Sequence, residues 1–467
     1  IATYFSPFVF YFSVHHSLKV FLCKAPSPPE LTADAQTASS KQNRTDAIKM
    51  KNEAATAFRI ITTLSIVYIA SNFYRSSIAV IAPNMMDEIG LTHEELGIIG
   101  GIFFIAFALF QVPVGIFLDR YGPRKTICVL ALFAAIGSVG FSLATNFLEL
   151  SAARFVIGIG CAPVLMGSLV IISRWLSVER FAFYASLIVG MGGVGNILAT
   201  TPTAILTDII GWRDVFLIAS GVSAFSAIFG FFIIKDAPKD HAFHDREIES
   251  MKDTLLGVME IIRNRQFQYI FAINLVIYGT VMTIVALWGG NFLRDIYGLD
   301  LTARGNILFW MTAGVIGGNF FYGYVDGLFR TRKPLVLAAA STTILLLVIL
   351  AVIPVIAVWQ VSALLILFSF FGSYGVLIMS HGRSIFPERL LGRGIATLNT
   401  AVFLGVFLLQ SMGGFIIGGF VSDDGVAPLM AYRVFFITLA ILVSIGVFAY
   451  SRSEESKNTD KKAPETA

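Results

Sequence analysis

The chain has 467 residues, of which 56% are hydrophobic and only 14% are charged, and its formal net charge is +4. Soluble domains carry about 25% charged residues, so this composition excludes a soluble globular enzyme, a disordered chain and a coiled coil. The small net charge gives no indication of a nucleic-acid partner. The three cysteines, Cys23, Cys128 and Cys161, lie too far apart for a metal-binding motif or a disulfide framework.

Twelve apolar stretches are long enough to cross a bilayer, because a hydrocarbon core of about 30 Å requires about 20 apolar residues per helix. Most of these stretches are bounded by charged residues, Gly or Pro. We therefore predict an all-α membrane protein with twelve transmembrane helices. The predicted spans are roughly residues 58–82, 95–118, 125–144, 148–172, 181–206, 212–234, 269–293, 303–327, 334–354, 358–380, 392–418 and 430–450.

The charges of the short loops orient the predicted bundle. The loops after the second, fourth, eighth and tenth helices hold eleven basic residues, whereas the loops at the opposite end hold four. Loops rich in Lys and Arg stay on the cytoplasmic side. The first loop at the opposite end, residues 87–95, has four acidic residues and no basic one. We expect a multi-pass protein of a bacterial-type inner membrane, with both termini in the cytoplasm.

The N-terminal tail, residues 1–57, begins without Met, and it changes from apolar to polar after residue 22. One interpretation of the apolar part is an interfacial or secretory-like segment. We favour the alternative that the native chain starts at Met50 and that the preceding residues are translated upstream sequence.

Residues 235–268 form the longest internal connection and carry charges of both signs. Apolar residues recur there at helical spacing, which favours an amphipathic helix on the inner membrane surface over a mobile linker. These apolar residues are Ile248, Met251, Leu255, Met259 and Ile262. The predicted domains are the tail (1–57), a six-helix bundle (58–234), this linker, a second six-helix bundle (269–451) and a polar cytoplasmic tail (452–467).

Four features recur after about 208 residues, at equivalent membrane edges, which indicates an internal duplication. The matching pairs are Asn84 with Asn291, Gly90 with Gly298, Asp119 with Asp326, and Glu179-Arg180 with Glu388-Arg389. An offset that spans six helices gives two halves of the same orientation. This arrangement is the parallel repeat of a large class of transporters, which bind substrate near the membrane midplane between the halves.

The loop after the second predicted helix carries a compact charged motif. It reads Gly115-Ile116-Phe117-Leu118-Asp119-Arg120-Tyr121-Gly122-Pro123-Arg124-Lys125. This segment resembles the G-x-x-x-D-R-x-G-x-R-K loop of the major facilitator superfamily. A degraded second copy contains Gly323 and Asp326, followed by Arg330, Arg332 and Lys333. The resemblance covers about residues 55–451 and implies two parallel-repeat six-helix bundles around a central cavity.

In that family the loop is a conformational gate, in which a helix-end carboxylate pairs with arginines in one state and separates in the other. The alternative interpretation is that these charges only set membrane topology. The resemblance assigns the gate to Gly115, Asp119, Arg120, Gly122, Arg124, Asp326 and Arg330. The segments around Arg75 and His381 are most similar to bacterial sugar-phosphate and organic-anion permeases. The fifth helix lacks the Gly-Pro pair typical of drug antiporters.

Polar residues are shared unevenly among the predicted spans. Away from their ends, helices 3, 6, 9 and 12 hold only small hydroxyls, whereas the other eight hold larger polar side chains, which face a bundle interior or a watery cavity. We therefore expect those eight to surround the cavity, with glycine-rich helices 2, 5, 8 and 11 in contact between the halves. The larger polar residues are Tyr68, Asn72, Arg75, Gln111, Arg154, Asn196, Asn274, Tyr278, Trp288, Trp310, Asn319, Tyr374, Asn399 and Gln410.

Arg75 and Arg154 each lie about 10 Å below the outer membrane surface, by the helical rise per residue. An unpaired Arg at such depth costs at least about 2.5–3.5 kcal/mol, and no Asp or Glu is predicted at mid-membrane depth. A substrate carboxylate or phosphate could complete the pairing. Alternatively, these arginines bind backbone carbonyls, hold helices together or relay protons. The predicted substrate-binding residues are Tyr68, Asn72, Arg75, Arg154, Asn274, Tyr278 and Tyr374.

Together these features predict a secondary-active transporter that moves a small organic anion across the cytoplasmic membrane by alternating access. We expect a monomer in the lipid bilayer, with H⁺, Na⁺ or a counter-substrate as the coupled species, and no cofactor, metal or nucleic acid. The alternatives are an exporter of a small amphipathic compound and a non-transporting membrane sensor of the same fold. No cluster of catalytic residues indicates an enzyme.

Overall fold

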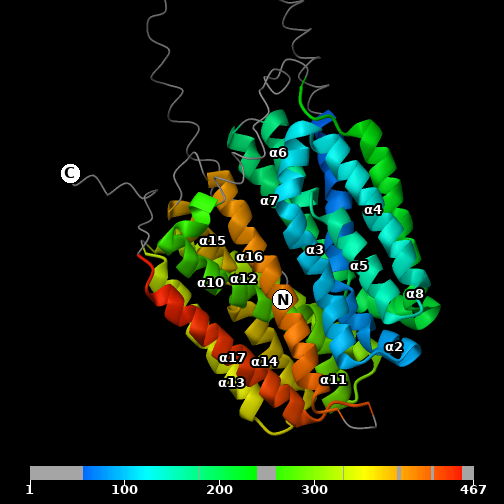
Figure 1. Ribbon diagram of the computed structural model, residues 1–467, viewed down its shortest axis with the longest axis vertical. Coiled ribbons are helices and arrows are strands. Elements are labelled where there is room, and N and C mark those ends of the chain that lie inside the picture. The colour runs from blue at the N-terminus through cyan, green and yellow to red at the C-terminus, as the bar shows by residue number, and fades with distance from the viewer. Residues whose placement is uncertain are drawn as a thin grey trace, which may run out of the picture. The chain divides into compact units, whose positions relative to one another are not determined.

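The computed structural model describes residues 56–176, 178–238, 259–329, 331–385, 391–421 and 425–454. The elements in these ranges are helices (Figure 1). The described helices belong to one compact unit, Ala57–Ala467. The predicted tail before Thr56 and the predicted amphipathic positions Ile248, Met251 and Leu255 lie outside the described residues. The predicted domain boundaries therefore stay predictions.

The helices of the first half match predicted spans one to six. The boundary between α7 and α8 does not coincide with the predicted boundary between the fifth and sixth spans. Helix α7 ends at Leu198, and α8 includes the last residues of the fifth span. Gly211, with a φ of 83°, breaks α8 where the sixth span begins. The bounds are Thr56–Ser76, α2 Ile78–Ile89, α3 His93–Arg120, α4 Pro123–Leu143, α5 Phe147–Cys161, α6 Val164–Trp175, α7 Val178–Leu198 and α8 Thr201–Ile233.

The helices of the second half match predicted spans seven to twelve. Their bounds are α10 Arg265–Thr283, a π-helical turn Ile284–Trp288, α11 Gly289–Tyr297, α12 Leu301–Leu328, α13 Lys333–Val352, α14 Val358–Phe371, α15 Gly375–Ile385, α16 Leu391–Gly418 and α17 Leu429–Ser451. Ten helical stretches of the described chain are long and apolar enough to cross a membrane, and Phe183–Leu198 is a shorter one. The predicted twelve-helix all-α fold is confirmed.

Four predicted spans are interrupted, and the interruptions fall at matching places in the two halves. The first span turns at Ser77, and the seventh contains the π-helical turn that starts at Ile284. The fourth breaks at Pro163 and the tenth at Gly372. Proline has no N–H to donate to the preceding turn, which explains the break between α5 and α6. The apolar stretches that predict the spans continue on both sides of each interruption, so hydropathy alone does not locate the breaks.

The turns after α2 and α11 show the repeat at atomic level. Gly90 and Gly298 follow these helices with φ angles of 78° and 61°, in the left-handed region that glycine adopts most readily. The next helices then begin at polar caps. The side chain of Thr92 accepts a hydrogen bond from the N–H of Glu95, and Asp300 accepts one from the N–H of Ala303.

Helices α3 and α16 lie side by side where the two halves meet (Figure 1). Their glycines allow this close approach. A Cβ atom at Gly97 would lie 2.8 Å from the carbonyl oxygen of Gln410, and one at Gly414 would lie 2.6 Å from that of His93. The predicted glycine contact between helices 2 and 11 is therefore confirmed.

Most of the glycines in helices 5 and 8 behave differently. Gly195 packs against the backbone of Ile69 and Gly318 against that of Phe370, each within its own half. Gly193 and Gly305, in contrast, face the other half: a Cβ atom at Gly193 would lie 3.2 Å from Ile316, and one at Gly305 would lie 2.7 Å from the Cβ of Ala204. Helices α7 and α12 also pack against each other. The predicted contact of helices 5 and 8 between the halves is therefore confirmed, although Gly195 and Gly318 accommodate neighbours inside one bundle.

Adding a side chain between α3 and α16 is expected to destabilise the protein. Gly414→Val should lower the free energy of unfolding by about 1–3 kcal/mol, because the new methyl groups overlap backbone atoms of α3 that cannot move independently. The midpoint of thermal unfolding in detergent measures this. Gly221→Val is the matched control, because a Cβ at Gly221 meets no atom within 4 Å. Equal midpoints for the two variants would contradict the packing argument.

Candidate functional site

A cavity of about 740 Å³ lies between the two halves. Its described lining residues come from the eight spans predicted to surround a pathway, and none comes from spans 3, 6, 9 or 12. The cavity extends from Arg75 toward Ser380 and Ile395, which lie near the end that carries the Gly115–Lys125 loop. The uneven distribution of polar residues along the sequence therefore predicts correctly which helices form this cavity.

Arg75 projects into the cavity between two aromatic rings. Its guanidinium carbon lies 5.4 Å from the ring centre of Phe107 on α3 and 5.3 Å from that of Phe403 on α16. The two ring centres are 4.2 Å apart, so these rings also join the halves. The Nε atom of Arg75 is buried and has no hydrogen-bond partner in the part of the chain that the structure describes. Within the described residues, no carboxylate forms an ion pair with this guanidinium.

Tyr68, Asn274 and Tyr278 line the same cavity as Arg75. The Nδ2 atom of Asn274 donates to the carbonyl oxygen of Leu398 at 2.9 Å, so this amide also ties α10 to α16. The ring of Tyr278 meets Phe403 edge-on, with ring centres 6.5 Å apart. Four of the seven predicted binding residues are thus brought together around one space.

Arg154, Asn72 and Tyr374 do not line the cavity. Arg154 is 1% exposed, and its Nη1 atom donates to the carbonyl oxygen of Tyr74 at 2.7 Å. The guanidinium also lies over the ring of Phe103, at 4.9 Å from its centre. This geometry matches the alternative interpretation, in which the arginine binds a backbone carbonyl and joins helices. The depth of Arg154 was predictable, but the side of the helix that faces the cavity was not.

Asn72 and Tyr374 are also directed into helix contacts. The Nδ2 atom of Asn72 donates to the carbonyl oxygen of Tyr68 at 2.9 Å, and its side chain packs against Gly192 of α7. Tyr374 is fully buried, and its ring packs edge-on against Tyr322. The helical spacing of Tyr68, Asn72 and Arg75 predicts one face, but a face about 100° wide includes both the cavity wall and its flank.

Other residues of the site were not selected from the sequence. Gln111, Asn319 and Asn399 line the cavity, and their polarity inside predicted spans was an available signal. Phe107 and Phe403 gave no signal, because the chain contains 42 phenylalanines. Only the folded structure distinguishes these two rings from the others.

The opposite end of the cavity is closed by contacts between the halves. The Nη2 atom of Arg294 on α11 lies 2.6 Å from Oδ1 of Asp87 on α2. These residues are 207 positions apart and belong to the two copies of the repeated motif. His93 of α3 lies 3.8 Å from Asp295, which also accepts a hydrogen bond from Tyr432 at 2.7 Å. Equivalent positions of the repeat thus meet across the interface.

At the other end, an unpredicted carboxylate organises the motif loop. Gly122, with a φ of 84°, precedes α4, and the N–H of Arg124 donates to Oδ1 of Asp236 at 2.7 Å. The Nε atom of Arg124 donates to the carbonyl oxygen of Phe231 at 2.7 Å. A carboxylate at a helix N-terminus is favourable for the helix dipole. Asp236 therefore caps α4, a contact that the loop sequence alone does not contain.

The other predicted gate residues lie around this cap and its repeat. Asp119 and Arg120 are exposed at the end of α3, and a Cβ atom at Gly115 would meet nothing within 4 Å. In the second half, Asp326 accepts two hydrogen bonds from Arg332, at 2.7 and 3.1 Å. Arg330, which the resemblance assigned to the gate, lies outside the described residues.

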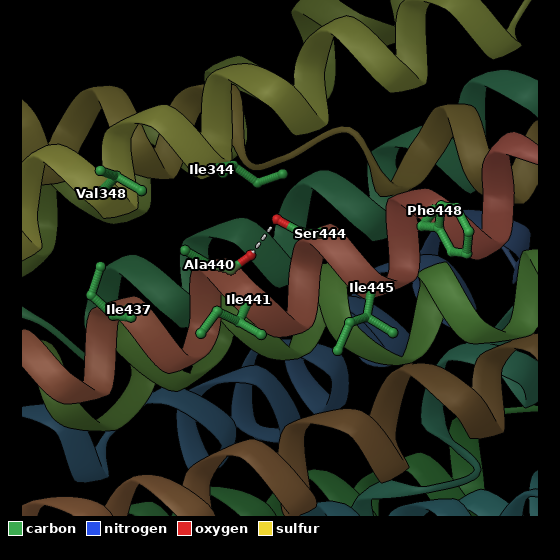
Figure 2. Close-up of a pocket in the computed structure, with 8 residues that line it drawn as sticks. All are labelled: Ile344, Val348, Ile437, Ala440, Ile441, Ser444, Ile445 and Phe448. Carbon is green, nitrogen blue, oxygen red and sulfur yellow. Dashed lines mark hydrogen bonds between the residues drawn. The ribbon is translucent and has the colours of Figure 1, made fainter.

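A second hollow of about 410 Å³ lies between α13 and α17 (Figure 2). It is lined by aliphatic side chains and Phe448. Its single hydroxyl, on Ser444, donates to the carbonyl oxygen of Ala440 at 2.8 Å. This hollow offers no charged group to a solute, which leaves the central cavity as the candidate site.

Comparison with known proteins gives relatives with transport functions. The chain is 24% identical to the "Probable sulfoacetate transporter" of Cupriavidus necator over 62% of this chain and 70% of that protein. It is 22% identical to the "Hexuronate transporter" of Escherichia coli K12, over 79% of this chain and 88% of that protein. It is also 22% identical to the "Probable L-galactonate transporter" of that strain, over 50% and 53%, so that match spans about half of the relative.

Solved structures show the same fold. A bacterial homologue of the human lysosomal transporter Spinster, in an inward-facing and occupied conformation, gives a TM-score of 0.69 at 16% identity, over 87% of this chain and 98% of that one. The nucleoside transporter NupG gives a TM-score of 0.67 at 14% identity, over 84% of this chain and 98% of that one. Identities this low show the fold alone.

The family model described as Major Facilitator Superfamily matches residues 64–409. This range includes the described residues that line the cavity, the Gly115–Lys125 loop and most of both halves of the repeat. The resemblance drawn from the sequence is therefore confirmed, and the relatives are transporters rather than enzymes. The chain belongs to the Major Facilitator Superfamily.

Proposed function

We propose that this protein is a secondary-active transporter that moves a small organic anion across the cytoplasmic membrane by alternating access. The observation that carries the proposal is the guanidinium of Arg75, which projects into the central cavity without a carboxylate partner among the described residues. The relatives support the anion class, since sulfoacetate, hexuronates and galactonate are all acids.

The energetics of Arg75 favour an anionic substrate. A cation inside a membrane protein is costly unless it is paired or hydrated. The rings of Phe107 and Phe403 stabilise its charge through cation–π contacts, yet the buried Nε–H of Arg75 has no acceptor among the described residues. A carboxylate or sulfonate can accept two parallel hydrogen bonds from the planar guanidinium. The substrate would thus supply the partner that the described part of the protein lacks.

Alternating access requires the two halves to close one end of the cavity at a time. In this structure Arg294 and Asp87 join the halves at one end, while the cavity extends toward the other. We propose that the opposite state breaks this ion pair and closes the end that carries Gly122, Arg124 and Asp326. In that state the predicted gate residues would exchange partners.

Removing the guanidinium of Arg75 should abolish anion recognition. Sulfoacetate, glucuronate, galactonate and tartrate serve as the probe panel, screened by thermal shift on the purified protein and then by counterflow into proteoliposomes. We expect Arg75→Gln to reduce uptake of the best probe by about 100-fold, because a charged hydrogen-bonded pair is worth 2–5 kcal/mol. Arg75→Lys should retain part of the activity, because it keeps the charge but loses the two-pronged geometry.

Arg265→Gln is the matched control, since Arg265 lies outside the cavity lining and its Nε atom donates to Tyr269 at 3.0 Å. Counterflow also separates a transporter from a sensor, because a sensor binds label without exchanging it. Wild-type uptake by Arg75→Gln would refute the anion site. Binding without counterflow in the wild type would refute transport.

Reversing one charge at the closed end should open that end. In Arg294→Asp two carboxylates would face each other, so we expect spin labels on the loops after α2 and α11 to move apart. The double variant Asp87→Arg/Arg294→Asp should restore the short distance. Glu88→Gln is the control, because Glu88 pairs with Arg213 inside the first half. No change in Arg294→Asp would contradict the proposed role of the pair.

Removing the cap of α4 should destabilise the motif loop. Asp236→Ala is expected to lower the free energy of unfolding by about 1 kcal/mol, because the N–H of Arg124 loses its acceptor. Asp236→Asn keeps an acceptor and should lose less. The unfolding midpoint in detergent measures both variants, and equal losses would show that charge rather than capping decides the effect.

A further inference from the structure

The cavity has polar side chains about one helical turn away from Arg75. Phe107 and Phe403 flank the guanidinium, and Gln111 and Asn399 follow on the same helix faces, four residues closer to the end near Ser380. Four residues of helix rise about 6 Å and return to the same face. Two amides therefore lie one helical turn from the level of the cation, on opposite halves.

Two further polar groups complete this level. Asn319 of α12 is the counterpart of Gln111 in the internal repeat. Tyr278 of α10 lies four residues before Met282, one helical turn closer to the end near Ser380. We call Gln111, Tyr278, Asn319 and Asn399 the polar layer. All four line the cavity, and within the part of the chain that the structure describes none of their side chains makes a hydrogen bond. They are available to a solute.

The chemistry of the polar layer suits hydroxyl groups. Each side-chain amide donates hydrogen bonds through its NH₂ group and accepts them at its carbonyl oxygen, and a phenol hydroxyl both donates and accepts. None of the four groups is charged. The level of Arg75, in contrast, is walled by Phe107, Phe403 and Met282. A ligand that spans both levels meets one cation and then a layer of neutral hydrogen-bonding groups.

The charge of the cavity limits the charge of its ligand. Arg75 is the single charged side chain among the described residues that line it. Arg154 is buried outside the lining, and its Nη1 atom is taken by the carbonyl oxygen of Tyr74. A second carboxylate on the ligand would therefore lie in the polar layer without a cation, and burying an unpaired charge is costly.

We infer that the cavity selects a singly charged organic anion, a carboxylate or sulfonate, that carries hydroxyl groups about one helical turn from its charge. This inference rests on the proposed function, because it uses Arg75 as the anion-binding group. It goes further by assigning the specificity to the polar layer and by excluding dianions.

Three probes of equal carbon-chain length test the two parts separately. Gluconate has one carboxylate and a hydroxylated body, glucarate adds a second carboxylate, and hexanoate lacks the hydroxyls. Titration calorimetry on the purified full chain gives the dissociation constants. We expect gluconate to bind about tenfold or more tightly than glucarate, because the second charge is unpaired. Hexanoate should be weaker than gluconate by about tenfold, because the polar layer then loses its partners.

Exposed Asn319 allows the layer to be altered directly. Asn319→Leu should weaken gluconate binding by about fivefold, because the substitution removes hydrogen bonds to the hydroxyl groups. The dissociation constant of hexanoate, which has no hydroxyl groups, should stay unchanged. Asn319→Lys should strengthen glucarate binding by about tenfold, because it supplies the missing cation. Asn399→Lys tests the same point from α16 if the first variant fails to fold.

The outcomes separate this inference from the proposed function. Gluconate that binds no more tightly than glucarate or hexanoate, or that does not bind, overturns the inference. If other anions then still bind in a manner that depends on Arg75, the proposed function stands alone. If Arg75→Gln leaves the binding of all anions unchanged, both fail.

Discussion

One guanidinium in a region of low dielectric, without an ion-pair partner among the described residues, constrains this protein. Arg75 lies between Phe107 and Phe403, and these rings belong to opposite halves of the molecule. The cation–π contacts stabilise the positive charge, but they cannot satisfy its hydrogen-bond donors. Arg75 therefore lies where the two halves touch. In the proposed mechanism, an anion bound to Arg75 would link ligand binding to the relative movement of the halves.

The internal repeat explains how the two ends of the cavity can be controlled. At one end, Asp87 and Arg294 come from corresponding segments of the two halves and bind each other. At the other, Asp236 caps the helix that follows the charged loop, and Asp326 binds Arg332 in the second copy. The closed end is held by contacts between halves, whereas the described contacts at the open end lie within each half. That asymmetry is what one state of an alternating carrier requires.

The relatives and the cavity bear on different parts of the specificity. The proteins of similar sequence carry the names of several acids, some of which bear one charge and others two. The cavity of this chain offers one cation and a neutral polar layer among its described lining residues. If the proposed specificity holds, charge number and hydroxyl pattern are the properties by which this protein would distinguish its ligands.

The sequence by itself determined the helices, the repeat, the family and the eight spans that line the cavity, because burial in a bilayer imposes a strong pattern of apolar length and polar exceptions. It also indicated Arg75 as a candidate binding residue. Only the tertiary structure separated Arg75 from Arg154, since both have the same charge and the same predicted depth but face different neighbours. It likewise revealed Phe107, Phe403 and Asp236. Their roles depend on the rotation of each helix and on contacts distant in sequence, which no local pattern encodes.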